Sequence, residues 1–300
     1  MDRFESMAAF VAVCEAGGFS AAARRLGTPI ATISRRVADL EQQLQVQLLT
    51  RTTRAVALTE IGQNYFETAR RLLEELGEAE RLATGEYRAP KGELAAAAPI
   101  VLGRVYLTPI VTAFLSAYPE VDVDLRLADR MVNIAEEGID VALRVGDLPD
   151  SGQIAVRVGE IRHIVCAAPD YLARRGTPSS LDELAAHDCV TFTGLESARE
   201  WVFRRAGQVT RLPVRSRFAV TTAEAAVDAA VAGAGITRVL CYQASGPILD
   251  GRLELILRDH EPPPLPVHLI YAGGRVMPQK LRAFLDFVVP RLKPRLVFDP

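Results

Sequence analysis

Residues 19–44 decide the fold of the amino-terminal part of this 300-residue chain: Phe19-Ser-Ala-Ala-Ala-Arg-Arg-Leu-Gly-Thr-Pro-Ile-Ala-Thr-Ile-Ser-Arg-Arg-Val-Ala-Asp-Leu-Glu-Gln-Gln-Leu44. Ser20 is a natural N-cap for a short helix, because its hydroxyl can accept a free amide of the first turn. Gly27 then lets the chain turn. Thr28 can cap a second helix, and Pro29 suits its first position, where a missing N–H leaves nothing unsatisfied.

The second predicted helix has one apolar stripe and a basic outer face. The stripe recurs at intervals of four, three and four residues, through Ile33, Val37, Leu40 and Leu44. At 100° per residue, Arg35 lies nearly opposite that stripe, with Ser34 and Arg36 at its margins. A short helix, a tight turn and such a second helix indicate a helix-turn-helix, which reads the major groove of DNA. A plain three-helix packing with solvated arginines accounts for the same residues.

The flanks of the motif extend it into a small domain. Upstream, a helix is predicted from the apolar stripe Phe4, Met7, Ala8, Val11 and Cys14. Downstream, residues 51–54 (Arg-Thr-Thr-Arg) and 55–58 (Ala-Val-Ala-Leu) predict a two-strand wing, with arginines placed to contact phosphates beside the groove. Residues 21–55 hold six arginines against two acids, although the whole chain has a net charge of −2. The segment that would face DNA is therefore basic.

These segments together resemble the DNA-binding half of the LysR-type transcriptional regulators. The resemblance rests on residues 19–27, 33–41, 48–54 and 58–62, in that order. It implies a winged helix-turn-helix whose recognition helix begins at Pro29, with double-stranded DNA as the partner. The candidate DNA-binding residues are Ser20, Thr28, Pro29, Ile30, Thr32, Ser34, Arg35, Arg36, Arg51, Thr53 and Arg54.

Three positions depart from the pattern of that family. Pro29 stands where the family usually has serine, and Gln45 stands where it has glycine after the recognition helix. Thr28 and Pro29 can replace the serine cap, and Gln45 can adopt the left-handed conformation at a modest energetic cost. Ile30 replaces a polar residue or proline, and an apolar side chain there can read a thymine methyl group.

A long helix is predicted after the wing, capped by Thr59. Its apolar seam, at intervals of three and four, is Ile61, Tyr65, Ala69, Leu72, Leu76, Ala79 and Ala83. At 1.5 Å per residue this seam is about 33 Å long, too long and narrow to be buried on a sixty-residue domain. A second chain is the simplest partner, which predicts a homodimer on a pseudo-palindromic operator. The family resemblance adds pairing of dimers into tetramers. The alternative is packing against the later part of the same chain.

The last two hundred residues alternate between predicted strands and helices, which predicts parallel sheets with helices on their faces. Helices are expected at 105–118, 132–137, 223–231 and 279–289. Strands are expected at 94–98, 121–127, 140–145 and 267–271, at 190–192 and 214–220, and from residues 164 and 236. The resemblance implies two α/β lobes similar to those of periplasmic solute-binding proteins.

The predicted fold class is α/β overall. It combines a mainly α-helical winged helix-turn-helix, a long linker helix and a carboxy-terminal, two-lobed effector domain like a periplasmic binding protein. The predicted domains are 1–60 for DNA binding, 61–90 for the linker and dimerisation helix, and 91–300 for effector binding. Within the last, lobe I takes in about 91–162 and 266–300, and lobe II about 163–265.

A small-molecule effector is expected between the lobes. Open α/β sheets bind ligands at the carboxyl ends of their strands, where helix N-termini offer free amides. The candidate effector-binding residues are Pro99, Ile100, Val101, Leu102, Ala128, Arg144, Val145, Gly146, Thr193, Gly194, Thr221 and Thr222. Arg144 and Thr193 suit an anionic or carbonyl group, although an inter-strand salt bridge explains Arg144 equally well. Val101 replaces the serine or threonine of many relatives, which suggests an apolar effector portion or no contact there.

Composition and motifs argue against other classes. The chain is 49% hydrophobic and 24% charged, and its longest apolar stretch, residues 94–102, is broken by Pro99, so neither disorder nor a membrane partner is expected. No signal peptide is visible, and the cytoplasm is the expected location. Four scattered cysteines form no CxxC pair, and the four histidines lack metal-ligand spacing. Without GxSxG, P-loop or GxGxxG motifs, we expect no enzyme, cofactor or metal site.

The favoured hypothesis is a LysR-type regulator controlled by a small-molecule effector. One alternative keeps DNA binding but replaces the effector with thiol oxidation at Cys166, Cys189 or Cys241. Another is a solute-binding or enzymatic α/β protein whose amino-terminal helices only dimerise it. A gel shift with DNA separates the last alternative from the other two.

Overall fold

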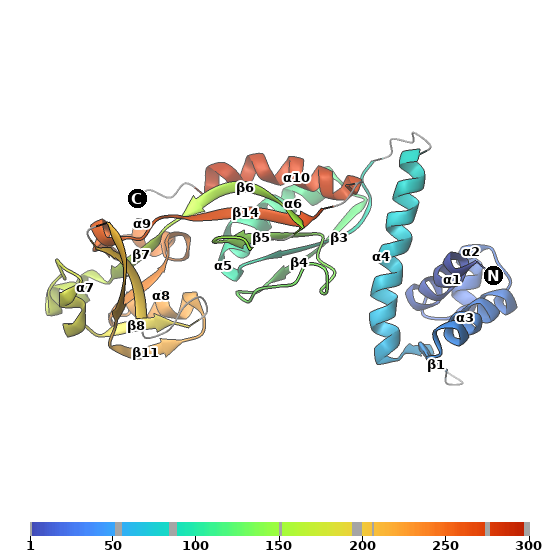
Figure 1. Cartoon of the computed structure of the whole chain (residues 1–300), viewed down its shortest axis with the longest axis horizontal. Helices are drawn as coiled ribbons and strands as arrows, with labels where there is room; N and C mark the ends of the chain where they lie inside the picture. Colours follow the sequence, from blue (N-terminus) through green and yellow to red (C-terminus); the bar gives the residue numbers. More distant parts are fainter. Residues whose placement is uncertain are drawn as a thin grey trace. The chain divides into compact units, whose positions relative to one another are not determined.

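The structure is a computed structural model that describes residues 2–51, 56–83, 89–149, 152–193, 200–205, 207–273 and 277–296. It divides into two compact units, residues 1–92 and 93–300 (Figure 1). Each unit is considered by itself.

The first unit consists of three helices, a two-stranded sheet and a long helix. In chain order these are α1 (Arg3–Glu15), α2 (Phe19–Leu26), α3 (Ile30–Leu44), β1 (Leu49–Arg51), β2 (Val56–Leu58) and α4 (Glu60–Ala83). The predicted stripe of α3 is buried around Ile33, Val37 and Leu40 and packs against α1, where Phe10 is fully buried. β1 and β2 pair antiparallel. The predicted winged helix-turn-helix is therefore confirmed.

Two predicted helix caps were wrong. α2 begins one residue before Ser20, with Gly18 at its N-cap, so Ser20 lies within the first turn. Pro29 occupies the N-cap of α3 rather than its first position, because its carbonyl accepts the first intrahelical amides. Thr28 does not cap α3; its hydroxyl donates to the carbonyl of Leu26 at 3.1 Å.

The core face of α1 also differs from the predicted stripe. Phe4, which the stripe included, is exposed, whereas Phe10 and Val13 are fully buried. Because α1 contacts α2, α3 and α4, it is buried around most of its circumference. A single stripe cannot be read from a helix that is surrounded in this way.

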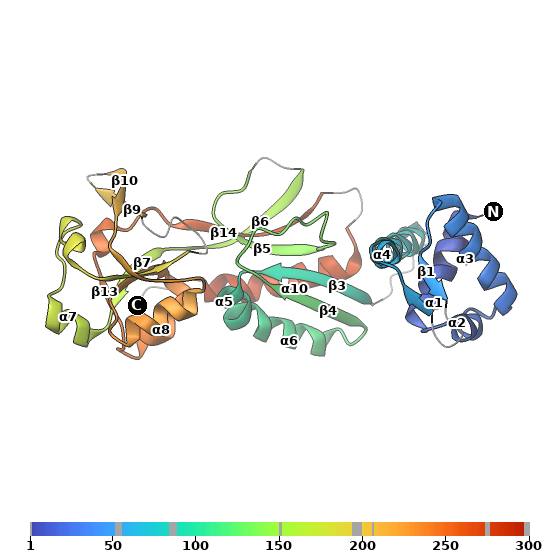
Figure 2. The same ribbon diagram turned by 90° about the horizontal axis from the view of Figure 1, so that it is seen from below.

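The second unit holds two five-stranded sheets (Figure 2). The first has the order β4-β3-β5-β14-β6, with β3 (Gly92–Ala98), β4 (Val121–Leu127), β5 (Val141–Val145), β6 (Gln153–Ile161) and β14 (Leu265–Ala272). The second has the order β11-β8-β12-β7-β13, with β7 (His163–Ala167), β8 (Cys189–Phe192), β11 (Ser216–Val220), β12 (Ile236–Leu240) and β13 (Glu254–Ile256). A separate hairpin joins β9 (Glu200–Arg205) and β10 (Gln208–Pro213).

Both sheets are mixed, which corrects the prediction of parallel sheets. β3 runs parallel to β5, and β8 runs parallel to β11 and β12. β14 is antiparallel to both β5 and β6, and β7 is antiparallel to both β12 and β13. Strand–helix–strand alternation predicts parallel pairing only for strands joined by such crossovers. β14 follows a long excursion through the second sheet instead, so alternation does not determine its direction.

Helices cover one face of the first sheet. They are α5 (Ile100–Leu102), a π-helical turn (Gly103–Leu107), α6 (Thr108–Ala117) and α10 (Gln279–Leu292). The rings of Phe114 and Phe284 join α6 to α10, with their centroids 5.3 Å apart. By length and composition the run Ile100–Ala117 could cross a membrane, but a buried core helix passes the same test, and Phe114 and Ile110 are buried here.

The opposite face of the first sheet is covered by residues 131–139. This segment forms turns, so the helix predicted at 132–137 was wrong. It is held from both ends, because Glu137 pairs with Arg130 at 2.6 and 2.7 Å and accepts the amide of Asn133 at 2.9 Å. Val132, Ile134 and Ile139 fill a small cluster beneath it.

The second sheet carries α7 (Pro169–Arg175), α8 (Ala223–Val231) and α9 (Ser245–Leu249). Short 3₁₀ turns occupy Asp182–Ala186, Cys241–Gln243, Arg258–His260 and Lys293–Arg295. The chain passes from the first sheet to the second at Arg162 and returns between residues 257 and 265. Arg162 and Glu261 form a salt bridge of 2.7 Å, which ties the two connecting segments together.

Candidate nucleic-acid interface and ligand pocket

The outer face of α3 presents the residues predicted to contact bases. Arg35 is exposed and has no hydrogen bond or ion pair with any residue that the structure describes. Ile30 is 50% exposed in the first turn, and Thr32 and Ser34 lie partly buried beside them. An exposed cation and an exposed apolar side chain at the start of one helix match the two kinds of contact that base edges offer in a major groove.

Arg36 has a protein partner. Its guanidinium forms an ion pair of 2.5 Å with Glu5 on α1, and it is the less exposed of the two side chains. Arg36 must exchange this carboxylate for a phosphate if it is to contact DNA. Surface pairs of this kind contribute only about 0–1 kcal/mol, so the exchange is feasible.

Glu41 positions the wing, a role that the sequence reasoning missed. Its carboxylate accepts the backbone amides of Leu48 and Leu49, at 2.8 and 3.0 Å, just where β1 begins. Gln45 lies between them in the left-handed conformation, with φ of 56°, as predicted. Hydrogen bonds from backbone amides to a carboxylate are charge-assisted and short. Glu41, on α3, therefore fixes the position at which β1 begins.

The wing also connects closely to α4. The hydroxyl of Thr59 accepts the amide of Gly62 at 2.9 Å and donates to the carbonyl of Gln47 at 2.8 Å. Thr59 thus caps α4, as predicted, and joins the cap to the segment before β1. The backbone amide of Thr59 donates to the carbonyl of Leu48 at 3.0 Å.

The predicted seam of α4 is divided between two environments. Ala69 is fully buried and Tyr65 packs on Phe10, with ring centroids 5.7 Å apart, so these two belong to the core of the first unit. Ile61 and Leu72 are 55% and 44% exposed. The face of α4 that is buried inside the unit is therefore rotated from the predicted seam. Ala69 is buried in the unit's own core and is not available to a second chain, whereas Ile61 and Leu72 remain about half exposed.

Some predicted site residues cannot be placed. Thr53, Arg54 and Gly194, and the side chains of Arg51, Ala79 and Ala83, lie outside the described residues.

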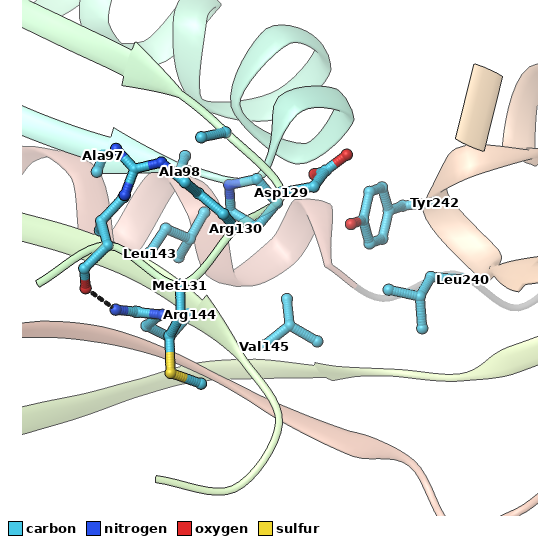
Figure 3. Close-up of a pocket in the computed structure, with 13 residues that line it drawn as sticks. Ala97, Ala98, Asp129, Arg130, Met131, Leu143, Arg144, Val145, Leu240 and Tyr242 are labelled. Carbon is cyan, nitrogen blue, oxygen red and sulfur yellow. Dashed lines mark hydrogen bonds between the residues drawn. The ribbon is translucent and has the colours of Figure 1, made fainter. Parts of the chain in front are cut away.

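A pocket of about 120 Å³ lies where the first sheet meets the end of β12 (Figure 3). Four of the predicted effector residues line it: Pro99, Ala128, Arg144 and Val145. The rest of the polar lining is Asp129 and Arg130, in the loop 128–130 that was predicted to face the ligand, and Tyr242, which sequence reasoning missed. Tyr242 and Leu240 come from the second lobe, a hundred residues along the chain, and no local pattern connects them to this site.

Arg144 lies in the wall of this pocket. Its guanidinium donates to the carbonyl of Val132, and its Nε is buried without a hydrogen-bond partner (Figure 3). Among the described residues it makes no inter-strand salt bridge, and burial lowers its pKa from the ordinary value. Leaving a buried guanidinium N–H unpaired is costly, and an anionic or carbonyl group on the Nε of Arg144 would relieve that cost.

Asp129 binds the N-terminus of α5, whose free amides were predicted to bind the effector. Its carboxylate accepts the amide of Ile100 at 3.0 Å. Burial, opposed by this hydrogen bond and reinforced by the charge of Glu224, raises the pKa of Asp129. Tyr242 faces Asp129 across the pocket, is almost fully buried, and has a pKa raised by burial and by the charge of Asp129 (Figure 3). A ligand here meets the carboxylate of Asp129 and the phenol of Tyr242, and the amide of Ile100 is already occupied.

The other predicted effector residues do not line the pocket. Val101 and Leu102 are buried in the core, and Ile100 uses its amide on Asp129. Thr222 caps α8, since its hydroxyl accepts the amide of Ala225 at 3.3 Å. The hydroxyl of Thr193 donates to Val220 at 3.2 Å. Gly146 and Thr221 also lie outside the lining.

A winged helix-turn-helix followed by a two-lobed α/β domain with a pocket between its lobes defines a ligand-responsive DNA-binding protein. Comparison with known families supports this class. Residues 4–63 match the model of the bacterial regulatory helix-turn-helix protein, lysR family, and residues 88–293 match that of the LysR substrate binding domain. The chain belongs to the LysR family of transcriptional regulators.

Relatives of the whole chain carry the same description. The HTH-type transcriptional regulator CrgA of Neisseria meningitidis is 35% identical over 96% of both chains, and the probable regulator LtrA of Klebsiella pneumoniae is 32% identical over 96% of this chain and 94% of the relative. The solved structure of CrgA, 34% identical, superposes over 96% of this chain and 98% of that chain with a TM-score of 0.62. Full-length AphB from Vibrio cholerae gives 0.61 at 28% identity, covering 97% of this chain and all of that one.

Proposed function

We propose that this LysR-type regulator binds pseudo-palindromic operator DNA as a homodimer or tetramer in the cytoplasm, and that a small effector in the pocket of Figure 3 shifts its operator affinity. The observation that carries the DNA half is the exposed guanidinium of Arg35 opposite the buried stripe of α3. The effector half is supported by a pocket that both lobes line. Binding between two lobes favours one relative arrangement of them, which is how a ligand shifts a population.

Arg35 provides the test of DNA binding. Duplexes selected from a random pool by the wild type serve as the operator. Arg35→Ala is expected to weaken binding by about 1–3 kcal/mol if the contact reads a base. Arg157→Ala is the matched control, because this exposed arginine lies on β6 and pairs with Glu160 at 2.8 Å. Equal affinities for wild type and Arg35→Ala in a fluorescence titration would remove Arg35 from the interface.

The dimer is proposed to form along the exposed part of α4. Ile61 and Leu72 are large apolar side chains of which about half, 55% and 44%, stays exposed among the described residues. Replacing both with Asp is expected to give monomers in sedimentation, because an interface core does not accommodate unpaired charges. Leu26→Asp, which changes an equally large exposed side chain on α2, is the control. Dimers that persist in the double variant would place the interface elsewhere.

The pocket is tested by filling it. Ala128 lines the pocket, and Ala128→Phe would occupy much of its roughly 120 Å³. This variant is expected to keep its operator affinity and lose the response to any compound that changes the affinity of the wild type. Ala173→Phe, at an exposed position on α7, is expected to respond normally. A filled pocket with an undiminished response would place the effector at another site.

The thiol alternative has no structural support. Cys166, Cys189 and Cys241 are buried, and burial raises the pKa of each. A redox-sensing cysteine needs an accessible thiolate.

A further inference from the structure

A second pocket lies in the second lobe, apart from the pocket of Figure 3. It has a volume of about 510 Å³ and is open to solvent between α7, β11 and the loop after α8. Its wall includes Asp188, directly before β8, Arg217, near the start of β11, and Gly233, ahead of β12. The pocket therefore lies at the amino ends of three parallel strands, whereas Leu240 and Tyr242 line the effector pocket at the carboxyl end of β12. In both views α7 lies at the far end of its lobe from α5 (Figures 1 and 2).

Positive charge dominates this second pocket. Three arginines line it, Arg174, Arg175 and Arg217, against one acid, Asp188. Asp188 is already shared between two guanidinium groups, at 2.9 Å from Arg217 and 3.6 Å from Arg215, and the hydrogen bond from Arg217 lowers its pKa. One carboxylate cannot neutralise this many cations, so the lining has an excess of positive charge.

Two of the guanidinium groups are available to a ligand. Arg175 donates one N–H to the carbonyl of Ala186 at 2.9 Å, and its other N–H groups remain available to a ligand. Arg174 makes no hydrogen bond or ion pair with any residue in the described part of the chain. Its Nη2 lies 3.2 Å from where a Cβ of Gly233 would be, so this glycine leaves the guanidinium room to rest against the loop.

The neighbouring titratable groups do not offset this charge. His187 packs beside Tyr171, with its Nδ1 3.1 Å from the phenol oxygen, and burial together with the charge of Arg175 lowers its pKa. Glu183 is engaged by the amide and hydroxyl of Ser179, at 2.8 Å each. His187 is thus neutral at pH 7, and Glu183 does not line the pocket.

An aromatic side chain completes the site. Phe218, next to Arg217 on the edge strand β11, is 49% exposed and lines the same pocket. A guanidinium group can donate two parallel hydrogen bonds to two oxygens of one phosphate. A phosphate dianion matches the excess positive charge of this pocket better than a monoanion does. An exposed aromatic ring offers a stacking surface to a planar heterocycle. We propose that this pocket binds a phosphate-bearing small molecule of the nucleotide type, with the phosphate on the available guanidinium groups of Arg174 and Arg175 and the planar group against Phe218.

Calorimetric titration of the full chain with AMP, inorganic phosphate and adenosine, at low salt and without DNA, tests the proposal. We expect AMP to bind, phosphate to bind about tenfold more weakly, and adenosine not to bind. Arg174→Gln combined with Arg175→Gln should weaken AMP binding at least about tenfold, since each removes charge-assisted hydrogen bonds. Phe218→Ser should reduce the affinity for AMP to that for phosphate.

Two controls separate this site from other arginines. Arg157→Gln, on the first sheet, and Arg35→Gln, on α3, should bind AMP as the wild type does. Thermal unfolding confirms that each variant is folded, and all the altered side chains are exposed. The proposal is overturned if AMP gives no heat of binding, if the double arginine variant binds AMP normally, or if Phe218→Ser leaves the preference for AMP over phosphate unchanged.

Discussion

Replacing Gly62 with alanine should destabilise the first unit selectively. A Cβ on this residue would lie 2.0 Å from the carbonyl oxygen of Leu48 and 2.8 Å from its carbonyl carbon. Both are backbone atoms, so no side-chain rotation can make room. Ordinary contact begins at 3.4 Å, and α4 and the start of β1 would have to separate by more than an ångström.

That separation disrupts contacts that hold the wing. The amide of Thr59 donates to the carbonyl of Leu48 at 3.0 Å, and the Thr59 hydroxyl caps α4 through the amide of Gly62. Losing a partly buried hydrogen bond costs about 1–3 kcal/mol. Accommodating an extra methyl group in a packed site costs a further amount of about 1–3 kcal/mol. We therefore expect the free energy of unfolding of the first unit to fall by about 2–6 kcal/mol.

Urea unfolding followed by two signals measures this effect. The single tryptophan of the chain, Trp201, lies in the second unit and reports its unfolding by fluorescence, whereas far-UV circular dichroism reports both units. The early part of the dichroism transition should move to lower urea in Gly62→Ala while the fluorescence transition stays in place. Gly246→Ala is the control, because no described atom outside its chain neighbours and the backbone of its own helix lies within 4 Å of where the added methyl group would be. A dichroism curve that matches the wild type would refute the steric reasoning.

Three further predictions follow from single contacts. Glu5→Gln releases Arg36, and operator affinity should rise by up to about fivefold in a fluorescence titration; weaker binding would show that the pair supports the fold instead. Burial and the charge of Arg238 lower the pKa of His163 to about 3, so the unfolded chain binds a proton that the folded chain does not between about pH 6.5 and 3. Stability should fall by about 2 kcal/mol from pH 7 to pH 5 through this residue, and His163→Gln should remove that part of the loss, which urea titrations at the two pH values can check. Burial raises the pKa of Cys166 and Cys189 to about 12, so neither should react with a thiol reagent until the chain unfolds; rapid labelling of the native protein would revive the thiol alternative.

The DNA-binding half could be predicted closely because its signals are local. The stripe of α3, the left-handed Gln45 and the Thr59 cap are each set by a few adjacent residues. Apart from the two helix caps, the errors arose where tertiary contacts decide. Surrounding helices bury α1 on several sides, and core packing takes Ala69 out of the predicted seam. Helix periodicity cannot distinguish burial inside a unit from burial against a second chain.

The effector half was predicted less well because its contacts are long-range. The pocket joins the loop around Asp129 to Tyr242, and only the folded chain brings them together. The rule that strand ends offer free amides did not account for Asp129, which takes up the amide of Ile100. Residues 132–137 form turns instead of the expected helix, because the hydrogen bonds between Arg130 and Glu137 close that segment.

The Arg162–Glu261 salt bridge holds the entrance and exit of the second lobe side by side. Residues 163–260 are thus an insertion between β6 and β14 with adjacent ends, and a segment with adjacent ends can be exchanged without stretching its host. The same geometry makes the lobe a natural unit for transplantation: a different ligand-reading lobe could be grafted at these two points while the first sheet, α4 and the winged helix-turn-helix keep their own sequence.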